Sequence, residues 1–177
     1  MIKLPNDTER LRFREVTLDD CLLYFQLLNQ EDYIRFIGDK NIQNLDDAET
    51  YIDTNQKPSY RINGFGSYIL VRKEDGKPLG FCGLYQRDGF DVPDLGYALL
   101  SEHHGQGYAR EAALGVLKHA ETHLGLNEIC AIVLPGNARS SHLLDAIGFT
   151  WSHNRSFPGT DETVEIYKRS SQIQAEK

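Results

Sequence analysis

The sequence has few cysteines, and their spacing is irregular. Cys21, Cys82 and Cys130 are the three cysteines in 177 residues; none forms a Cys-x-x-Cys pair, and each has an apolar neighbour. An odd, scattered set of this kind argues against a disulfide framework and is typical of buried thiols. We therefore expect a reducing, cytoplasmic setting.

Long apolar runs and excess positive charge are also missing. No run approaches the roughly 20 apolar residues of a membrane span, and the chain does not open with a basic-then-apolar signal segment. The net charge is −7, with a sequence pI of about 5.3. Neither nucleic acid nor an anionic membrane is an expected partner, whereas a cationic amine is compatible with this charge.

Two common phosphate-binding motifs are incomplete. A P-loop ends in Gly-Lys-Ser/Thr, but Tyr108 and Ala109 follow Gly107 here, and a dinucleotide-binding fingerprint needs a third glycine where Arg110 stands. The sequence does contain a glycine-bracketed turn, His104-Gly105-Gln106-Gly107-Tyr108-Ala109, between an apolar strand and a long helical pattern. Glycines there permit left-handed backbone angles, and the helix start offers unpaired N–H groups with partial positive charge. The turn predicts a diphosphate-binding site.

The order of the patterns indicates one mixed α and β domain over residues 1–177, with a loose polar tail from Ser170. Alternating or apolar runs predict strands over 10–16, 67–72, 79–86, 94–100, 129–134, from Phe149, and 163–168. Helical spacing predicts helices after Thr17, after Asn44, over 109–124 and after Asn137. Strand 94–100, the glycine turn, helix 109–124 and strand 129–134 form a βαβ unit, which implies a parallel strand pair.

A second motif follows the unbroken apolar strand 129–134. This segment reads Asn137-x-x-Ser140, two leucines, and Gly148-Phe149, and it resembles the Asn-x-x-Ser...Gly-Phe segment of the GNAT N-acetyltransferases. The glycine turn resembles the Gln/Arg-x-x-Gly-x-Gly/Ala loop of the same family, and the two motifs occur in the family's order. His104 stands in the Gln/Arg place, which is a departure from that pattern. The stretches 8–15 and 94–100 resemble the ribosomal-protein-alanine acetyltransferase-like branch.

The resemblance covers about residues 8–168. It implies an α+β fold with a mostly antiparallel, twisted sheet of about six to seven strands, a splayed parallel pair, and about four flanking helices. It also implies that acetyl-CoA is the cosubstrate. The residues it assigns to cofactor binding are Leu99, Leu100, His104, Gly105, Gln106, Gly107, Tyr108, Ala109, Arg110 and Asn137.

Acetyl transfer from a thioester to an amine needs a neutral amine and a proton for the departing thiolate. Asp94 is our candidate base, acting directly or through water, because it opens the strand leading to the expected reaction centre; Glu15, Tyr97 and His104 are alternatives. Ser140 is the candidate acid: relatives in this branch place a hydroxyl here, and Leu144 stands where other family members have a tyrosine. Asn137 suits a pantetheine amide, although an ordinary helix N-cap explains it as well.

Three other features of the sequence are weaker indications of function. His119 and His123 are four residues apart but lack the His-Glu-x-x-His order; we place them off the apolar stripe and expect no metal. Cys130 lies in a buried strand, which should raise its pKa rather than activate it. The alternating Arg10, Arg12 and Arg14 are interpreted as a solvated face.

The sequence therefore predicts a cytoplasmic, acetyl-CoA-dependent N-acetyltransferase, monomeric or homodimeric. Its acceptor would be a small-molecule amine or a protein N-terminus. The alternative is a catalytically silent module that binds acyl-CoA.

Overall fold

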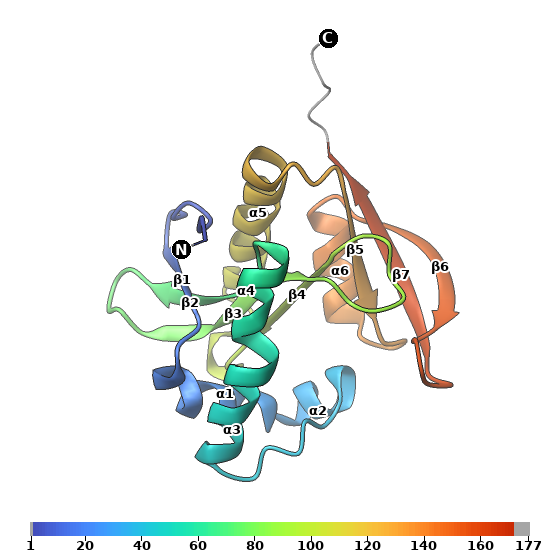
Figure 1. Ribbon diagram of the computed structural model, residues 1–177. Coiled ribbons are helices and arrows are strands. Elements are labelled where there is room, and N and C mark those ends of the chain that lie inside the picture. Colours follow the sequence, from blue (N-terminus) through green and yellow to red (C-terminus); the bar gives the residue numbers. More distant parts are fainter. Residues whose placement is uncertain (1, 172–177) are drawn as a thin grey trace.

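The computed structural model describes residues 2–171 and is built on a mixed sheet. Within those residues seven strands follow the order β1-β2-β3-β4-β5-β7-β6 (Figure 1). Their bounds are Leu11–Glu15 (β1), Ser67–Arg72 (β2), Pro78–Tyr85 (β3), Asp94–Leu99 (β4), Glu128–Val133 (β5), Thr150–Ser156 (β6) and Thr163–Ser170 (β7). The α+β fold and all seven predicted strands are confirmed, with shifts of one or two residues at several ends.

Five of the six strand pairings are antiparallel, and the exception is the predicted parallel pair β4–β5. β4 is paired with β3 at six positions from Asp94 to Leu99, but with β5 at one position, Asp94 opposite Cys130. The N–H of Cys130 donates to the carbonyl of Pro93 at 3.0 Å. Beyond this point β4 and β5 diverge, so the side of β4 that faces β5 has no neighbouring strand.

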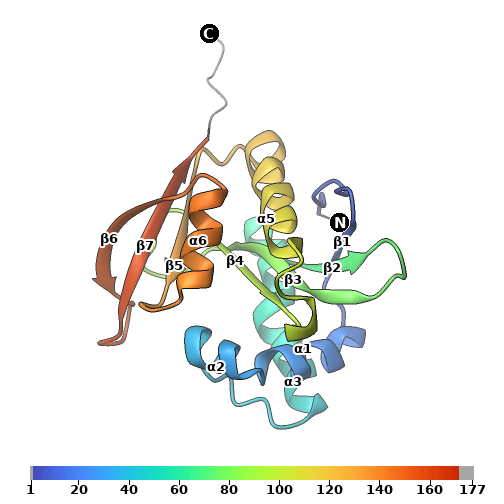
Figure 2. The ribbon, with the colours of Figure 1, turned by 180° about the vertical axis from the view of Figure 1, so that it is seen from behind.

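Helices cover both faces of the sheet. α5 and α6 lie on one face, and α1 and α3 lie on the other (Figures 1 and 2). The bounds are Cys21–Leu28 (α1), Glu31–Ile37 (α2), Leu45–Tyr51 (α3), Lys57–Asn63 (α4), Tyr108–His119 (α5) and Ala138–Ala146 (α6). Short 3₁₀ or wide π turns occur at Leu18–Asp20 (η1), Ile52–Gln56 (η2), Ser101–His103 (η3) and Ala120–Leu124 (η4). None of the helices in residues 2–171 combines the length and apolar character needed to cross a bilayer.

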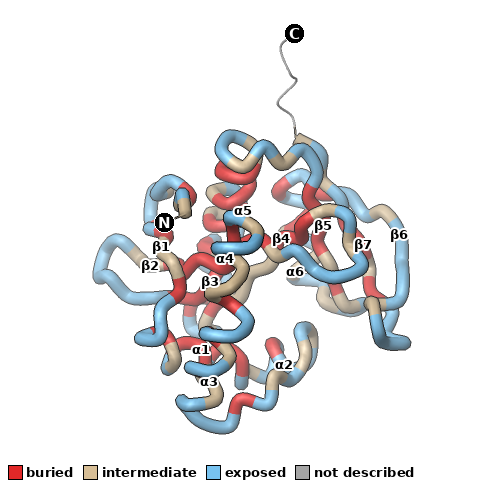
Figure 3. The backbone as a smooth tube through the Cα atoms, in the orientation of Figure 1, coloured by how far each residue is buried: buried red, intermediate tan, exposed pale blue. Residues whose placement is uncertain are grey.

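Period-two alternation divides the core between the two faces. On β2, Tyr68 and Leu70 join the cluster under α5 and α6, whereas Ile69 joins the cluster under α1 and α3. The buried side of α5 is continuous, while β6 at the sheet edge is exposed along its length (Figure 3). Alternation on β4 therefore decides which side chains can meet each helix layer.

The helix starts behave largely as predicted. The N–H of Thr17 donates to Asp20 Oδ2 at 2.9 Å, Asn44 Oδ1 caps α3 through the N–H of Asp47 at 2.9 Å, and Gly125 ends η4 in the left-handed conformation. About four helices were expected, and all four predicted segments contain one; α2 and α4 are additional. α2 buries one residue, Tyr33, and α4 continues from α3 through the π turn η2, so neither has a strong amphipathic pattern of its own.

Two sequence interpretations were wrong at single residues. Ser170 is not in the loose tail, because it ends β7 opposite Glu128; residues 172–177 lie outside the described part. His119 is not off the apolar stripe, since it is 2% exposed. Its ring meets Tyr68 edge-on, with centroids 6.3 Å apart, and stacks against His123 at 5.2 Å. His119 thus shares the buried face of α5 with Ala112 and Val116, and its ring packs against Tyr68 of β2.

The burial of His119 predicts a pH-dependent stability. Burial lowers the pKa of His119, and the nearby charges of His123 and Lys3 lower it further. As pH falls below 6.5, the unfolded chain takes up a proton at this residue that the folded chain refuses, so the free energy of unfolding decreases until the folded pKa is reached. Urea unfolding at pH 8 and pH 5.5 should show this loss, up to about 1.4 kcal/mol per pH unit. His119→Leu should flatten the slope, whereas an unchanged slope would contradict the assignment.

Candidate active site

The free side of β4 presents Leu99 and not Leu100. The N–H of Leu100 donates to the carbonyl of Leu79 on β3 at 2.9 Å. Backbone groups alternate in direction along an antiparallel strand, so the N–H and C=O of Leu99 point away from β3, toward the side where β5 has diverged. The predicted pairing of cofactor with the Leu100 amide is therefore corrected, because that amide already has a partner in the sheet. Leu99 keeps the role as a prediction.

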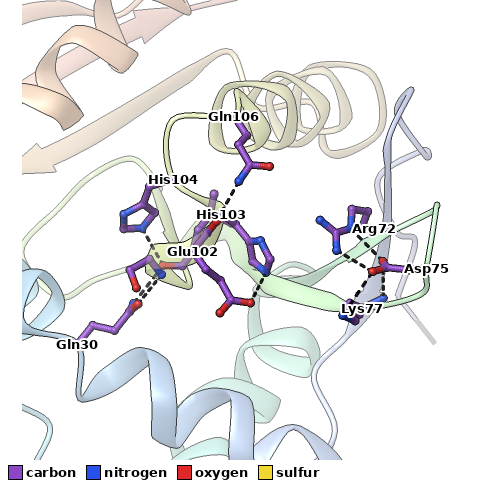
Figure 4. A network of polar contacts seen from close by, with 10 residues as sticks. Gln30, Arg72, Asp75, Lys77, Glu102, His103, His104 and Gln106 are labelled. Carbon is purple, nitrogen blue, oxygen red and sulfur yellow. Dashed lines mark hydrogen bonds and ion pairs between the residues drawn. The ribbon is translucent and has the colours of Figure 1, made fainter.

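The carbonyl of Leu99 is held by two side chains from outside the strand. It accepts from Gln30 Nε2 at 3.0 Å and lies 2.9 Å from His104 Nε2. Gln30 also accepts from the N–H of Ser101 at 2.6 Å. Figure 4 shows the Gln30 and His104 side chains converging on the backbone at the end of β4. Gln30, which the sequence did not point to, thus fixes the chain between β4 and the glycine loop.

The glycine loop has the conformation that its sequence predicts. Gly105 and Gly107 have φ values of 72° and 81°, which L side chains rarely adopt. The first hydrogen bond of α5 runs from the N–H of Glu111 to the carbonyl of Gly107 at 3.1 Å. The amides of Tyr108, Ala109 and Arg110 therefore have no acceptor within the helix, and the helix dipole adds partial positive charge there. The loop has the geometry of an anion site.

Arg10 holds this loop from the other end of the sequence. Its Nη1 donates to the carbonyl of Gln106 at 2.9 Å, its Nε donates to Glu111 Oε2 at 2.7 Å, and its guanidinium lies 4.4 Å from the centre of the Tyr108 ring. Gln106 itself donates to the carbonyl of Glu102 at 2.9 Å (Figure 4). Arg10 is exposed, as the solvated-face interpretation expected, but its pairing with a loop about a hundred residues away was missed because strand alternation does not reveal it.

The start of α6 brings two hydroxyls together. Asn137 Oδ1 accepts from the N–H of Ser140 at 3.2 Å, which confirms the N-cap interpretation and leaves the amide nitrogen of Asn137 with no hydrogen bond to the described residues. Ser140 Oγ lies 2.9 Å from Tyr97 Oη on β4. Burial raises the pKa of Tyr97 to about 12, partly offset by its hydrogen bond with Ser140. Tyr97 therefore keeps its proton and suits a donor better than the base for which it was an alternative.

Asp94 lies on the opposite face of β4 from this hydroxyl pair. Its neighbour in alternation, Ala98, contacts the cluster under α1 and α3, whereas Tyr97 contacts the cluster under α5 and α6. The Asp94 side chain is 3% exposed, and its Oδ1 accepts from Arg87 Nε at 2.7 Å. Burial raises the pKa of Asp94, and the Arg87 charge and hydrogen bond oppose that shift. Asp94 and Ser140 are thus placed on two sides of one strand.

The other candidates for proton transfer are less well placed. Glu15 lies on β1, separated from β4 by β2 and β3. Both ring nitrogens of His104 have partners, Leu99 O and Arg139 Nη1. Burial raises the pKa of Cys130 to about 12, in agreement with its predicted inertness. No group of three or more metal-ligating side chains occurs within residues 2–171.

The Asp94–Arg87 pair predicts unequal effects of removing its two members. Arg87→Met leaves a buried carboxylate without a counter-charge, which typically costs about 3–5 kcal/mol, whereas Asp94→Asn leaves an arginine that is 40% exposed and can be hydrated. We expect the arginine variant to be the less stable of the two by urea unfolding at pH 8.

The pH dependence of stability tests whether the unpaired Asp94 carboxylate causes the loss in Arg87→Met. Without Arg87 the folded pKa of Asp94 rises further above its unfolded value of 3.8, so the folded state of Arg87→Met gains stability as pH falls toward that value. The stability gap between Arg87→Met and wild type should narrow between pH 8 and pH 5. A gap that stays constant would show that lost packing, and not the unpaired carboxylate, is responsible.

Known proteins share the sequence pattern and the fold of this chain. The model of the acetyltransferase (GNAT) domain matches residues 10–150. The chain is 29% identical over 145 residues to the uncharacterized N-acetyltransferase YoaA of Bacillus subtilis, covering 81% of each chain. The fold is similar to an acetyltransferase from Agrobacterium tumefaciens, with a TM-score of 0.80, 23% identity, and 97% of each chain covered.

Two further solved structures share the fold at lower identity. One is spermidine N-acetyltransferase from Vibrio cholerae in complex with CoA and spermine, with a TM-score of 0.74, 18% identity, and 91% of this chain and 95% of that chain covered. The other is ribosomal-protein-S5-alanine acetyltransferase from Vibrio fischeri, with a TM-score of 0.71, 18% identity, and 97% and 98% covered. Because the family model matches most of its length, this chain belongs to the GNAT family of acetyltransferases.

Proposed function

We propose that this N-acetyltransferase moves the acetyl group of acetyl-CoA directly to a primary amine while both substrates are bound. The observation that carries the proposal is the divergence of β4 from β5 after the Asp94–Cys130 pair, with the glycine loop at the open end. A ligand containing amides can add to the free side of β4 as a strand does. Acetyl-CoA supplies the activated thioester.

Each part of the chain then has a separate task. The Leu99 amide and the free Asn137 amide nitrogen donate to pantetheine, and the amides of 105–110 hold the diphosphate, so the acetyl group is presented at the middle of β4. Tyr97 and Ser140, 2.9 Å apart, donate the proton that the leaving sulfur needs. Through their mutual hydrogen bond, the hydroxyl that has donated its proton can be reprotonated by the other.

Asp94 serves the amine from the opposite face. The Asp94 side chain is short and its carboxylate is ion-paired with Arg87, so the proton of the incoming ammonium reaches the carboxylate through water. Burial raises its pKa, which makes the carboxylate a better base than an exposed aspartate, and Arg87 limits that gain. Base and acid on separate faces keep the two proton transfers apart.

The proton-transfer assignments predict a set of kinetic losses. Asp94→Asn, Tyr97→Phe and Ser140→Ala should each lower kcat by about 10²-fold or more, because general acids and bases typically contribute 10²–10⁴-fold. Calorimetric affinity for CoA should change little. Ser141→Ala is the matched control, since this neighbouring hydroxyl contacts the carbonyl of Asn137 and not Tyr97. Losses below about threefold in all three variants would remove the assignment.

The acceptor is proposed to be a small amine or a peptide N-terminus. Segment 30–65 supplies α2 and α3, whose buried residues Tyr33 and Ala48 belong to the cluster on the face where Asp94 lies, and it carries exposed carboxylates such as Glu31 and Asp46. Tyr33 is buried and serves packing, so it is not a wall for the acceptor; Phe36 is half-buried and remains a candidate. Among proteins with this fold, one is a spermidine acetyltransferase and another acts on the alanine of a ribosomal protein.

An acceptor panel tests this proposal. Labelled acetyl-CoA would be incubated with the protein and with spermidine, aminoglycosides, basic N-terminal peptides and internal-lysine peptides. We expect turnover with a cationic primary amine or an N-terminus, because the acidic chain attracts cations. A preference for an internal lysine or an anionic acceptor would contradict the proposal. Tight CoA binding without turnover on any amine would support the non-catalytic alternative.

A further inference from the structure

Arg139 links three elements at the open end of the β4–β5 pair. The chain leaving β4 carries His104, and the chain leaving β5 carries Arg139 at the start of α6. Arg139 Nη1 lies 3.0 Å from His104 Nδ1, and Arg139 Nη2 donates to Asp32 Oδ2 on α2 at 3.2 Å. One guanidinium therefore spans the place where the two diverging strands end.

The hydrogen bonds around His104 define its role. Leu99 O can only accept, so the His104 Nε2 that lies 2.9 Å from it carries the proton. Nδ1 is then the acceptor, and Arg139 is the donor. In this tautomer the ring offers no free N–H to an anion. A cation next to the glycine loop comes from Arg139 instead, held in position by the ring.

The ion pair between Arg139 and Asp32 is weak enough for another anion to replace the Asp32 carboxylate. The side chains of Arg139 and Asp32 are 62% and 51% exposed, and an ion pair this exposed contributes little to stability. A guanidinium presents a planar fork of N–H groups that matches two phosphate oxygens, and such charge-assisted pairs are stronger than single ones. A diphosphate arriving at the loop can therefore compete with the Asp32 carboxylate.

We propose that Arg139 is a ligand of the acetyl-CoA diphosphate. Before the cofactor binds, Arg139 pairs with Asp32 across the site, and the diphosphate then replaces the Asp32 carboxylate. We call this exchangeable ion pair the latch. The inference rests on the proposed function, because it assumes that acetyl-CoA binds at the glycine loop. It adds a residue outside the loop and a competitor within the chain. A plain surface ion pair would have neither property.

Substituting the two partners separates the latch from a plain ion pair. Arg139→Gln removes a ligand, so CoA should bind about tenfold more weakly or worse. Asp32→Asn removes the competitor, so CoA should bind about two- to fivefold more tightly. A pair that only supports the fold would shift both affinities in the same direction. Calorimetry with CoA measures both without requiring turnover.

Three controls narrow the interpretation. Arg61→Gln and Glu49→Gln make the same charge changes at exposed positions on α4 and α3, so they report general electrostatics. S-acetylpantetheine lacks the diphosphate, and its KM should not respond to Arg139→Gln. Equal thermal midpoints for all four variants would exclude loss of folding as the cause.

The outcomes are distinguishable. Opposite shifts for Arg139→Gln and Asp32→Asn, with both controls unchanged, support the latch. Shifts of the same sign, or no shift in Arg139→Gln while wild type binds CoA, overturn the latch and leave the proposed function intact. Wild-type protein that does not bind CoA overturns both.

Discussion

The arrangement of the site depends on one constraint, the need of backbone N–H and C=O groups for partners. β4 satisfies one side fully against β3, but it is paired with β5 only at Asp94 opposite Cys130 among the described residues. Unpaired backbone groups in a sheet favour an added strand, so the free side of β4 suits the proposed ligand, which contains amides. The glycine loop and α6 follow the diverging strands, and their positions are consequences of the same divergence.

The division of the sheet into two faces explains why the ionisable groups near β4 behave differently. Tyr97 lies under α5 and α6, where it meets Ser140 of α6 and where burial keeps the phenol protonated. Asp94 lies on the other face, where burial and Arg87 shift the pKa of the carboxyl in opposite directions. A strand with alternating side chains can therefore present a proton donor and a proton acceptor within four residues while keeping them out of contact.

Much of the fold was predictable because its signals are local. The glycines of the loop were recognisable because L side chains rarely adopt their φ values, and Asn137 was recognisable as a cap for α6. What the sequence did not reveal depends on distant partners or on register. Arg10 meets Gln106, and Arg139 meets Asp32, across 96 and 107 positions. The choice of Leu99 over Leu100 follows from strand parity, which a shift of one residue reverses. His119 lies three residues after Val116 and seven after Ala112, so helical spacing places it on the buried stripe of α5, and only its polar side chain concealed this.

The central claim is that the free side of β4 and the glycine loop form one continuous binding site for CoA. Titrating CoA into ¹⁵N-labelled protein and following backbone amide resonances tests it most directly. The account predicts the largest shifts at Leu99 and at the amides of residues 105–110, with small shifts at the far end of α5 around His119. If CoA binds while the amide resonances of Leu99 and of the glycine loop do not shift, the claim of one continuous site is contradicted.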